Sequence, residues 1–108
     1  MKEPKEHVIT EIIEYLPQAI VSKTILDKIT GNITASSLDE GIKIGSSISH
    51  FDKYVQIIDG SAELTINDIS YTLIMGQGIL IPANSKYMFS ANQPFKMIAT
   101  VIKSGYEI

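Results

Sequence analysis

The chain has 108 residues and a net charge of −3, and 44% of its residues are hydrophobic. This length predicts one domain, which can bury roughly two thirds of its unfolded surface around a single core. All nine basic residues are lysine, so the negative charge and the lack of arginine argue against nucleic-acid binding, and the absence of cysteine excludes disulfides, thiolate nucleophiles and cysteine metal sites.

The first 18 residues predict an N-terminal segment, helical or irregular, ahead of a domain that spans residues 19–108. The opening stretch MKEPKEHV is charged and lacks the apolar region of a secretory signal, and no apolar run reaches the roughly 18 residues of a spanning helix. We therefore expect a cytoplasmic protein with no membrane contact. Apolar residues at helical spacing predict a short helix that ends before Pro17, and a bent strand is the alternative. These residues are Val8, Ile9, Ile12, Ile13 and Leu16.

From residue 19 onward, short runs rich in β-branched and aromatic residues alternate with turn residues. This pattern is typical of an all-β sandwich or barrel. Asp59-Gly60 predicts a two-residue hairpin turn, and the apolar run at 79–81 shows no alternation, which suggests that both of its faces are covered. The predicted strands are 19–26, 33–38, 42–45, 54–58, 62–66, 70–75, 79–81, 86–90 and 95–102.

Alternation within these strands also predicts which side chains form the core. Lys53, Val55 and Ile57 fall on one face, so Lys53 is expected to point into the barrel. The predicted core residues are Val55, Ile57, Leu64, Ile66, Leu73, Ile79, Ile81, Phe89, Phe95 and Met97.

Two spaced motifs resemble those of small single-domain cupins, whose patterns are G(X)5HXH(X)3–4E(X)6G and G(X)5PXG(X)2H(X)3N. Gly41 and Gly60 occupy the framework positions of the first motif, and Gly76 and Pro82 occupy those of the second. The resemblance covers roughly residues 19–104. It implies a cupin-like double-stranded β-helix, or jelly-roll barrel.

All four metal-ligand positions of the two motifs are substituted in this chain. Ser47 and Ser49 stand at the first two histidine positions, Lys53 at the glutamate position and Tyr87 at the third histidine position. A divalent metal in such a barrel requires imidazole and carboxylate ligands, which serine, lysine and tyrosine do not replace. The resemblance is therefore carried over without the metal and without any cofactor.

Histidine and carboxylate side chains could in principle form a displaced metal site. His50 and Asp52 lie two residues apart, on the strand face opposite to Ser47, Ser49 and Lys53. We expect His50 at the barrel rim with a local hydrogen bond, and no metal.

The four substituted positions should converge inside the barrel. Ser47, Ser49, Lys53 and Tyr87 are the predicted ligand-binding residues, for a small anionic or carbonyl-bearing molecule. The alternative is a vestigial site in which the lysine reaches solvent and the serines bond to the backbone.

Two classes of function remain open from the sequence. The first is a metal-free, dimeric cupin-like protein that binds a small molecule or acts structurally. The second is a metal-independent enzyme, of isomerase or epimerase type, that uses Lys53 or Tyr87 as acid or base. The homodimer is expected because related small cupins pair through an N-terminal strand, and the apolar stretch 19–26 would otherwise be an exposed edge.

Overall fold

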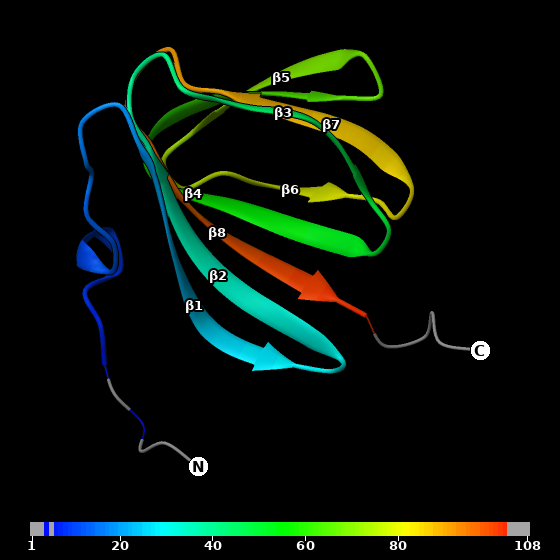
Figure 1. Cartoon of the computed structure of the whole chain (residues 1–108), viewed down its shortest axis with the longest axis horizontal. Helices are drawn as coiled ribbons and strands as arrows, with labels where there is room; N and C mark the ends of the chain where they lie inside the picture. Colours follow the sequence, from blue (N-terminus) through cyan, green and yellow to red (C-terminus); the bar gives the residue numbers. More distant parts are fainter. Residues whose placement is uncertain (1–3, 5, 104–108) are drawn as a thin grey trace.

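The computed structural model describes Pro4 and residues 6–103. Nearly all regular structure in this part of the chain is β-strand (Figure 1). The elements are the 3-10 helix η1 (Ile9–Glu11) and the strands β1 (Ile20–Lys28), β2 (Gly31–Leu38), β3 (Lys43–Ser49), β4 (Asp52–Ile66), β5 (Ile69–Ile74), β6 (Gly78–Ile81), β7 (Ser85–Ser90) and β8 (Phe95–Ile102).

The strands form one antiparallel sheet that curls into two layers. Its main order is β1-β2-β8-β4-β7-β3, and β5 and β6 also pair with β4. The first half of β4 lies between β8 and β6, and its second half pairs with β5 and β7. Figure 1 shows the result: β1, β2 and β8 form one side of the curl, and β3, β5 and β7 form the other. The all-β, jelly-roll prediction is confirmed.

The hairpin predicted at Asp59-Gly60 is wrong, because β4 continues through both residues as one 15-residue strand. The register with β8 shifts between Ile57 and Asp59, and Gly60 has φ +71. A β-bulge of this kind bends a strand sharply, and it uses the same positive φ that a hairpin turn needs. A Cβ at Gly60 would lie 2.1 Å from the Pro94 carbonyl oxygen, so the close approach of the neighbouring chain also requires glycine here.

The core fills the inside of the curl, as the alternation predicts. Every predicted core residue belongs to this cluster, with Ile79 at its partly buried margin. Leu38, Ala62 and Ala91 complete the buried set. The aromatic rings of Phe89 and Phe95 pack against each other in this cluster, tilted by 33° with centroids 6.2 Å apart. Nearly complete burial of these large side chains is the main source of stability of a domain this size.

The prediction for 79–81 that both faces are covered is wrong. Ile81 is fully buried, whereas Leu80 is 51% exposed on the outer face. Pairing with β4 places Leu80 opposite Tyr54, whose side chain also lies outside the curl. The three consecutive apolar residues 79–81 therefore alternate between the inner and the outer face, as in an ordinary strand.

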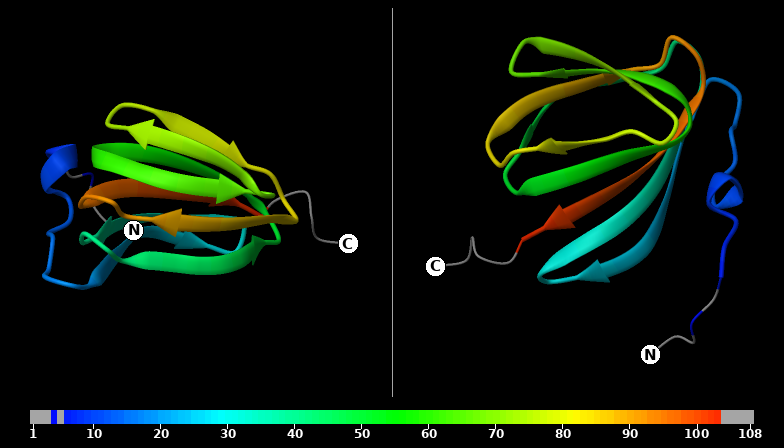
Figure 2. Two further views of the ribbon diagram at one scale, coloured as in Figure 1. Left: turned by 90° about the horizontal axis from the view of Figure 1, so that it is seen from above. Right: turned by 180° about the vertical axis from the view of Figure 1, so that it is seen from behind.

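The part of the N-terminal segment that follows residue 5 packs on the outside of the curled sheet (Figure 2). Between residues 6 and 18, only the three residues Ile9–Glu11 are helical, so the predicted helical face does not form. Ile12 and Ile13 are buried against Ala35, Val21 and neighbouring outer-face residues. The other apolar residues of the predicted face stay exposed: Val8, Ile9 and Leu16.

Candidate functional site

Lys53 points into the curl, as predicted, from the first half of β4. Its register partners on either side are Val101 in β8 and Ile81 in β6. The ammonium group reaches the opposite layer, where Nζ donates a 2.8 Å hydrogen bond to the Tyr87 hydroxyl of β7. Nζ also lies 4.7 Å from the centroid of the Tyr87 ring. Lys53 and Tyr87 are 34 positions apart in the sequence, and their side chains meet across the inside of the barrel.

Tyr87 is held in place by the core. Its ring packs edge-on against buried Phe89, with centroids 5.9 Å apart. Its backbone pairs with Ser47 of β3 on one side and with Ile66 of β4 on the other. The hydroxyl therefore occupies a fixed position, and the flexible partner in the contact is the four-carbon lysine stem.

After this hydrogen bond is made, both side chains still have N–H or O–H groups that can donate to a ligand. Because the Tyr87 oxygen accepts from Lys53, its own O–H remains free to donate to a third group. The ammonium carries two further N–H groups. One positive charge and three neighbouring donors form a site suited to a carboxylate, phosphate or sulfate oxygen.

The two serines behave differently from the lysine and the tyrosine. The Ser47 hydroxyl donates to the Gly45 carbonyl at 3.0 Å, and the hydroxyl of buried Ser49 donates to the Phe51 carbonyl. Both bonds are local, from a side chain to a carbonyl two residues away. Of the four predicted site residues, the structure joins Lys53 to Tyr87 by side-chain contact, while the serine hydroxyls bond to their own stretch of backbone.

The residues considered for a displaced metal site do not converge. His50 is exposed, and Asp52 lies on the outer face of β4, opposite Ile102, where Oδ1 accepts a 2.9 Å hydrogen bond from the Ala83 N–H. Within the described residues, no three His, Asp or Glu side chains are grouped as metal ligands would be. The ammonium, phenol and hydroxyl groups at the motif positions also do not fit a divalent metal.

Sequence reasoning missed a set of polar side chains on the same inner face as Lys53. Asn32 and Thr34 of β2 lie on the face that carries buried Leu38, because residues two apart share a face. The signal was present in the alternation of residues 32–38, where every second side chain is Asn, Thr, Ser and then Leu.

No protein-family model and no curated protein matches the sequence. Comparison of structures finds a cupin superfamily protein from Desulfitobacterium hafniense, with a TM-score of 0.87 at 18% identity over 94% of each chain. A cupin 2 conserved barrel domain protein from Leptotrichia buccalis gives a TM-score of 0.84 at 24% identity, over 87% of this chain and 46% of that one. At these identities the likeness concerns the fold.

The chain thus has the fold of the small cupin proteins. A conserved protein of unknown function from Streptococcus pyogenes is 31% identical, with a TM-score of 0.88 over 95% of this chain and 90% of that one. No helix of the described residues is long and apolar enough to cross a membrane.

Proposed function

We propose that the protein binds a small organic anion between Lys53 and Tyr87, without a metal. The observation that carries this proposal is the 2.8 Å hydrogen bond from Lys53 Nζ to the Tyr87 hydroxyl, which brings one positive charge and the remaining donors of the two side chains together inside the barrel. A carboxylate placed there would accept from both side chains and supply a counter-charge for the half-buried ammonium.

The neighbouring side chains support an organic ligand over a bare inorganic ion. Val101 and Ile81 flank Lys53 on the same face, and Val55, one step further along β4, is fully buried. A ligand held by its anionic group would therefore place its carbon atoms against apolar side chains. This combination of a few polar groups and an apolar surround is typical of small-molecule sites.

A thermal-shift screen of small carboxylates and phosphates tests the proposal, with titration calorimetry of the best compound. We expect Lys53→Met to abolish the shift and Tyr87→Phe to weaken it. Lys43→Met is the matched control, because it removes the same charge from an exposed position of β3. Equal shifts in the wild type and in Lys53→Met would contradict the proposal.

Anion binding by Lys53→Met, measured together with its stability, separates a working site from a vestigial one. Methionine has a shape similar to the lysine stem and carries no charge, so stability should stay equal or rise. Loss of anion binding together with unchanged stability supports a binding role. A substitution that is silent in every assay would mean that the site is vestigial.

The same pair of residues supports a second proposal, metal-independent acid–base catalysis. A lysine and a tyrosine side chain in contact can each donate a proton to a bound carbonyl compound in the protonated form and accept one in the deprotonated form, as isomerisation or epimerisation requires. Turnover that survives a chelator but is lost in both Lys53→Met and Tyr87→Phe would favour the enzyme. Binding without turnover favours the binding protein.

The homodimer is also a proposal, and the N-terminal part of the chain supports it. Six large apolar side chains between residues 8 and 26 are exposed: Val8, Ile9, Leu16, Ile20, Ile25 and Leu26. A hollow of about 370 Å³ lies beside the edge strand β1, with Ile12, Ile13 and Val21 among its lining residues. Burial of such a surface against a second copy is a common outcome for exposed edge strands.

Light scattering at micromolar concentration tests the dimer. The expected mass is twice that of the 11.9 kDa chain. Leu26→Glu should lower the mass to that of the monomer, while Leu80→Glu, an equally exposed leucine on β6, should leave it unchanged. A monomeric wild type would contradict the proposal.

A further inference from the structure

The inner face of the β1–β2–β8–β4–β6 layer is divided into an apolar half and a polar half. Register places Asp27, Asn32, Val101, Lys53 and Ile81 side by side in one row across the five strands. The next row inward contains Thr24, Thr34, Ala99, Val55 and Ile79. The third row contains Ser22, Ser36, Met97 and Ile57. Apart from Lys53, every polar side chain in these rows comes from β1 or β2.

This polarity is not explained by exposure alone. Ser36 is only 7% exposed, and its hydroxyl lies 3.1 Å from that of Ser22. Asn32 and Thr34 are half-buried. Apolar residues would be expected at such positions, because the same face of β8 carries Phe95, Met97 and Ala99 in the core. Polar groups placed where burial is available indicate a surface that contacts something polar.

The polar half lies within reach of the anion site. Adjacent strands are about 4.8 Å apart, so Asn32 and Lys53, two strands apart, are separated by roughly 10 Å at the backbone. Their side chains extend from the same face and narrow that gap. A ligand with its anionic group at Lys53 and a chain of about six carbon atoms would cross the single intervening strand, β8, and arrive at Asn32 and Thr34.

We infer that the ligand is a hydroxylated monoanion, such as a sugar acid, whose hydroxyl groups bind the Asn32 and Thr34 side chains of β2. This inference rests on the proposed anion site at Lys53. Amide and hydroxyl side chains both donate and accept hydrogen bonds, which matches an alcohol and not a hydrocarbon chain. Asp27 at the end of the row disfavours a second negative charge at the far end of the ligand.

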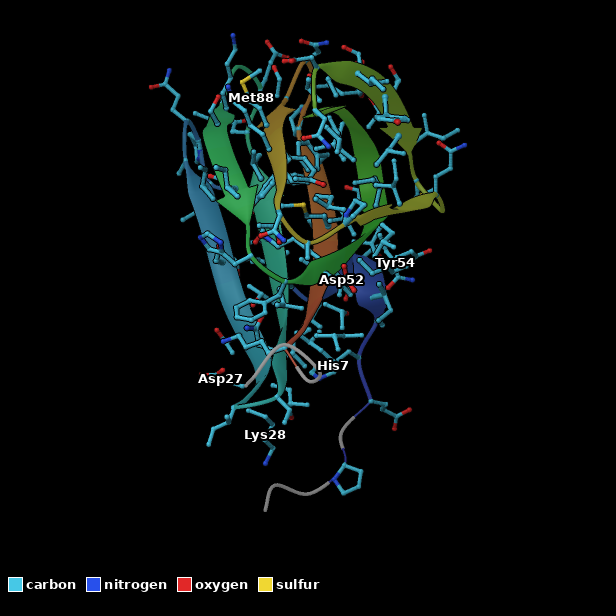
Figure 3. The ribbon with its side chains drawn as sticks, turned by 90° about the vertical axis from the view of Figure 1, so that its right-hand side faces the viewer. His7, Asp27, Lys28, Asp52, Tyr54 and Met88 are labelled. Atoms are coloured by element: carbon cyan, nitrogen blue, oxygen red, sulfur yellow. The ribbon has the colours of Figure 1, made fainter. Side chains whose placement is uncertain are left out.

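Figure 3 shows the end of the molecule where β1 ends and β4 begins. Asp27 and Lys28 lie there at the tip of the β1–β2 hairpin, and Asp52 is the first residue of β4. The row that contains Lys53 is therefore the outermost of the three on β1, β2 and β4. A ligand could enter from this end and contact the row first.

Calorimetry with two pairs of compounds tests the inference: gluconate against hexanoate, and glycerate against propanoate. Gluconate should bind about tenfold more tightly than hexanoate, as expected for one or two additional hydrogen bonds. Glycerate should show no such preference over propanoate, because a three-carbon chain does not reach β2. Glucarate, with a second carboxylate, should bind more weakly than gluconate.

Two substitutions test whether the preference for gluconate depends on β2. Thr34→Val keeps the shape of a β-branched residue and removes the hydroxyl, and should lower gluconate affinity several-fold with hexanoate affinity unchanged. Thr65→Val makes the same change on the outer face of β4, between the buried residues Leu64 and Ile66, and should change neither affinity.

The outcomes separate this inference from the proposed function. If hexanoate binds as tightly as gluconate and both depend on Lys53, the anion site stands and the hydroxylated ligand is wrong. If gluconate is preferred but Thr34→Val and Asn32→Leu have no effect, the hydroxyl groups bind elsewhere and the inference is likewise overturned. If none of the five anions binds in a manner that depends on Lys53, the anion site itself is wrong.

Discussion

The Tyr15 hydroxyl donates a 2.6 Å hydrogen bond to Asp59 Oδ2, and this contact joins the N-terminal segment to the bend in β4. Lys96, next to Asp59 in the β4–β8 register, is almost fully buried beneath the segment. Its Nζ lies 4.8 Å from the centroid of the Tyr15 ring and donates to the Thr10 carbonyl. The segment is thus held by polar contacts at the place where the central strand changes layers.

Attachment of the segment should weaken at high pH. Burial raises the pKa of Tyr15 well above its ordinary value near 10, and the hydrogen bond to Asp59 and its negative charge raise it further. A pKa that is higher in the folded state stabilises the fold below the ordinary value, and this contribution is lost as pH rises past it. We therefore expect the urea midpoint of the wild type to fall above about pH 10.

Tyr15→Phe identifies the source of that alkaline change. The substitution removes a partly buried hydrogen bond to a carboxylate and should cost on the order of 1 kcal/mol at pH 7. Tyr71→Phe, at an exposed position of β5, is the control and should cost little. An equal alkaline fall in Tyr15→Phe and wild type would assign the change to another group.

Acid should weaken the turn that leads into β1. Asp39 Oδ2 accepts a 2.6 Å hydrogen bond from the Gln18 N–H, and this bond, followed by that from the Glu40 N–H, lowers the pKa of Asp39 from its ordinary value of about 3.8. A pKa that is lower in the folded state stabilises the fold above the ordinary value, and the contribution is lost as pH falls through the folded value.

The variant Asp39→Ala should consequently be less stable than the wild type at pH 7. The difference should narrow as pH falls below about 3.8. Denaturant midpoints at pH 7 and pH 3 provide the test. A gap between the two proteins that is the same at both pH values would show that the carboxylate charge is not involved.

Gly60→Ala should lower the free energy of unfolding by more than about 3 kcal/mol, for two reasons. The new Cβ would overlap the Pro94 carbonyl oxygen, and alanine is strained at the positive φ of this position. Gly41→Ala isolates the second cost. Gly41 also has a positive φ, of +84, but no atom of the described residues lies within 4 Å of the position of its Cβ, so we expect a loss of about 1–2 kcal/mol. Similar melting temperatures for the two variants would contradict a backbone clash at Gly60.

Neighbouring residues of β6 should respond very differently to truncation. Ile81→Ala removes a fully buried side chain and should cost about 2–5 kcal/mol. Leu80→Ala removes a side chain that is half exposed on the outer face and should cost less than about 1 kcal/mol. Chemical denaturation of both variants measures the difference, and equal losses would mean that the outer face is covered in solution.

The sequence is informative where one local pattern decides the outcome. Alternation alone placed Val55, Ile57 and Leu64 in the core, because the period of a strand is fixed by backbone geometry. The same logic gave the inward direction of Lys53. Asn67-Asp68, a pair of typical turn residues, joins β4 to β5, and both residues adopt the positive φ that such a turn requires.

Local sequence patterns do not predict features that depend on pairing with strands distant in the sequence. Asp59-Gly60 fits a hairpin turn and a bulge equally well, and only the pairing of β4 with β8, β5 and β7 selects the bulge. The 2.8 Å contact between Lys53 and Tyr87 likewise depends on how the two layers close. Ser47 and Ser49 were expected to face a ligand, but their nearest carbonyl acceptors lie on their own stretch of chain.

The continuity of β4 has a consequence for how the molecule loses its structure. This single strand forms hydrogen-bonded ladders with β5, β6, β7 and β8, and it contributes residues to both layers. Neither layer can separate from the other while β4 stays intact, so partial opening of one layer should be rare. In native-state hydrogen exchange, amides of β4 on both sides of the bulge should exchange together and only through complete unfolding.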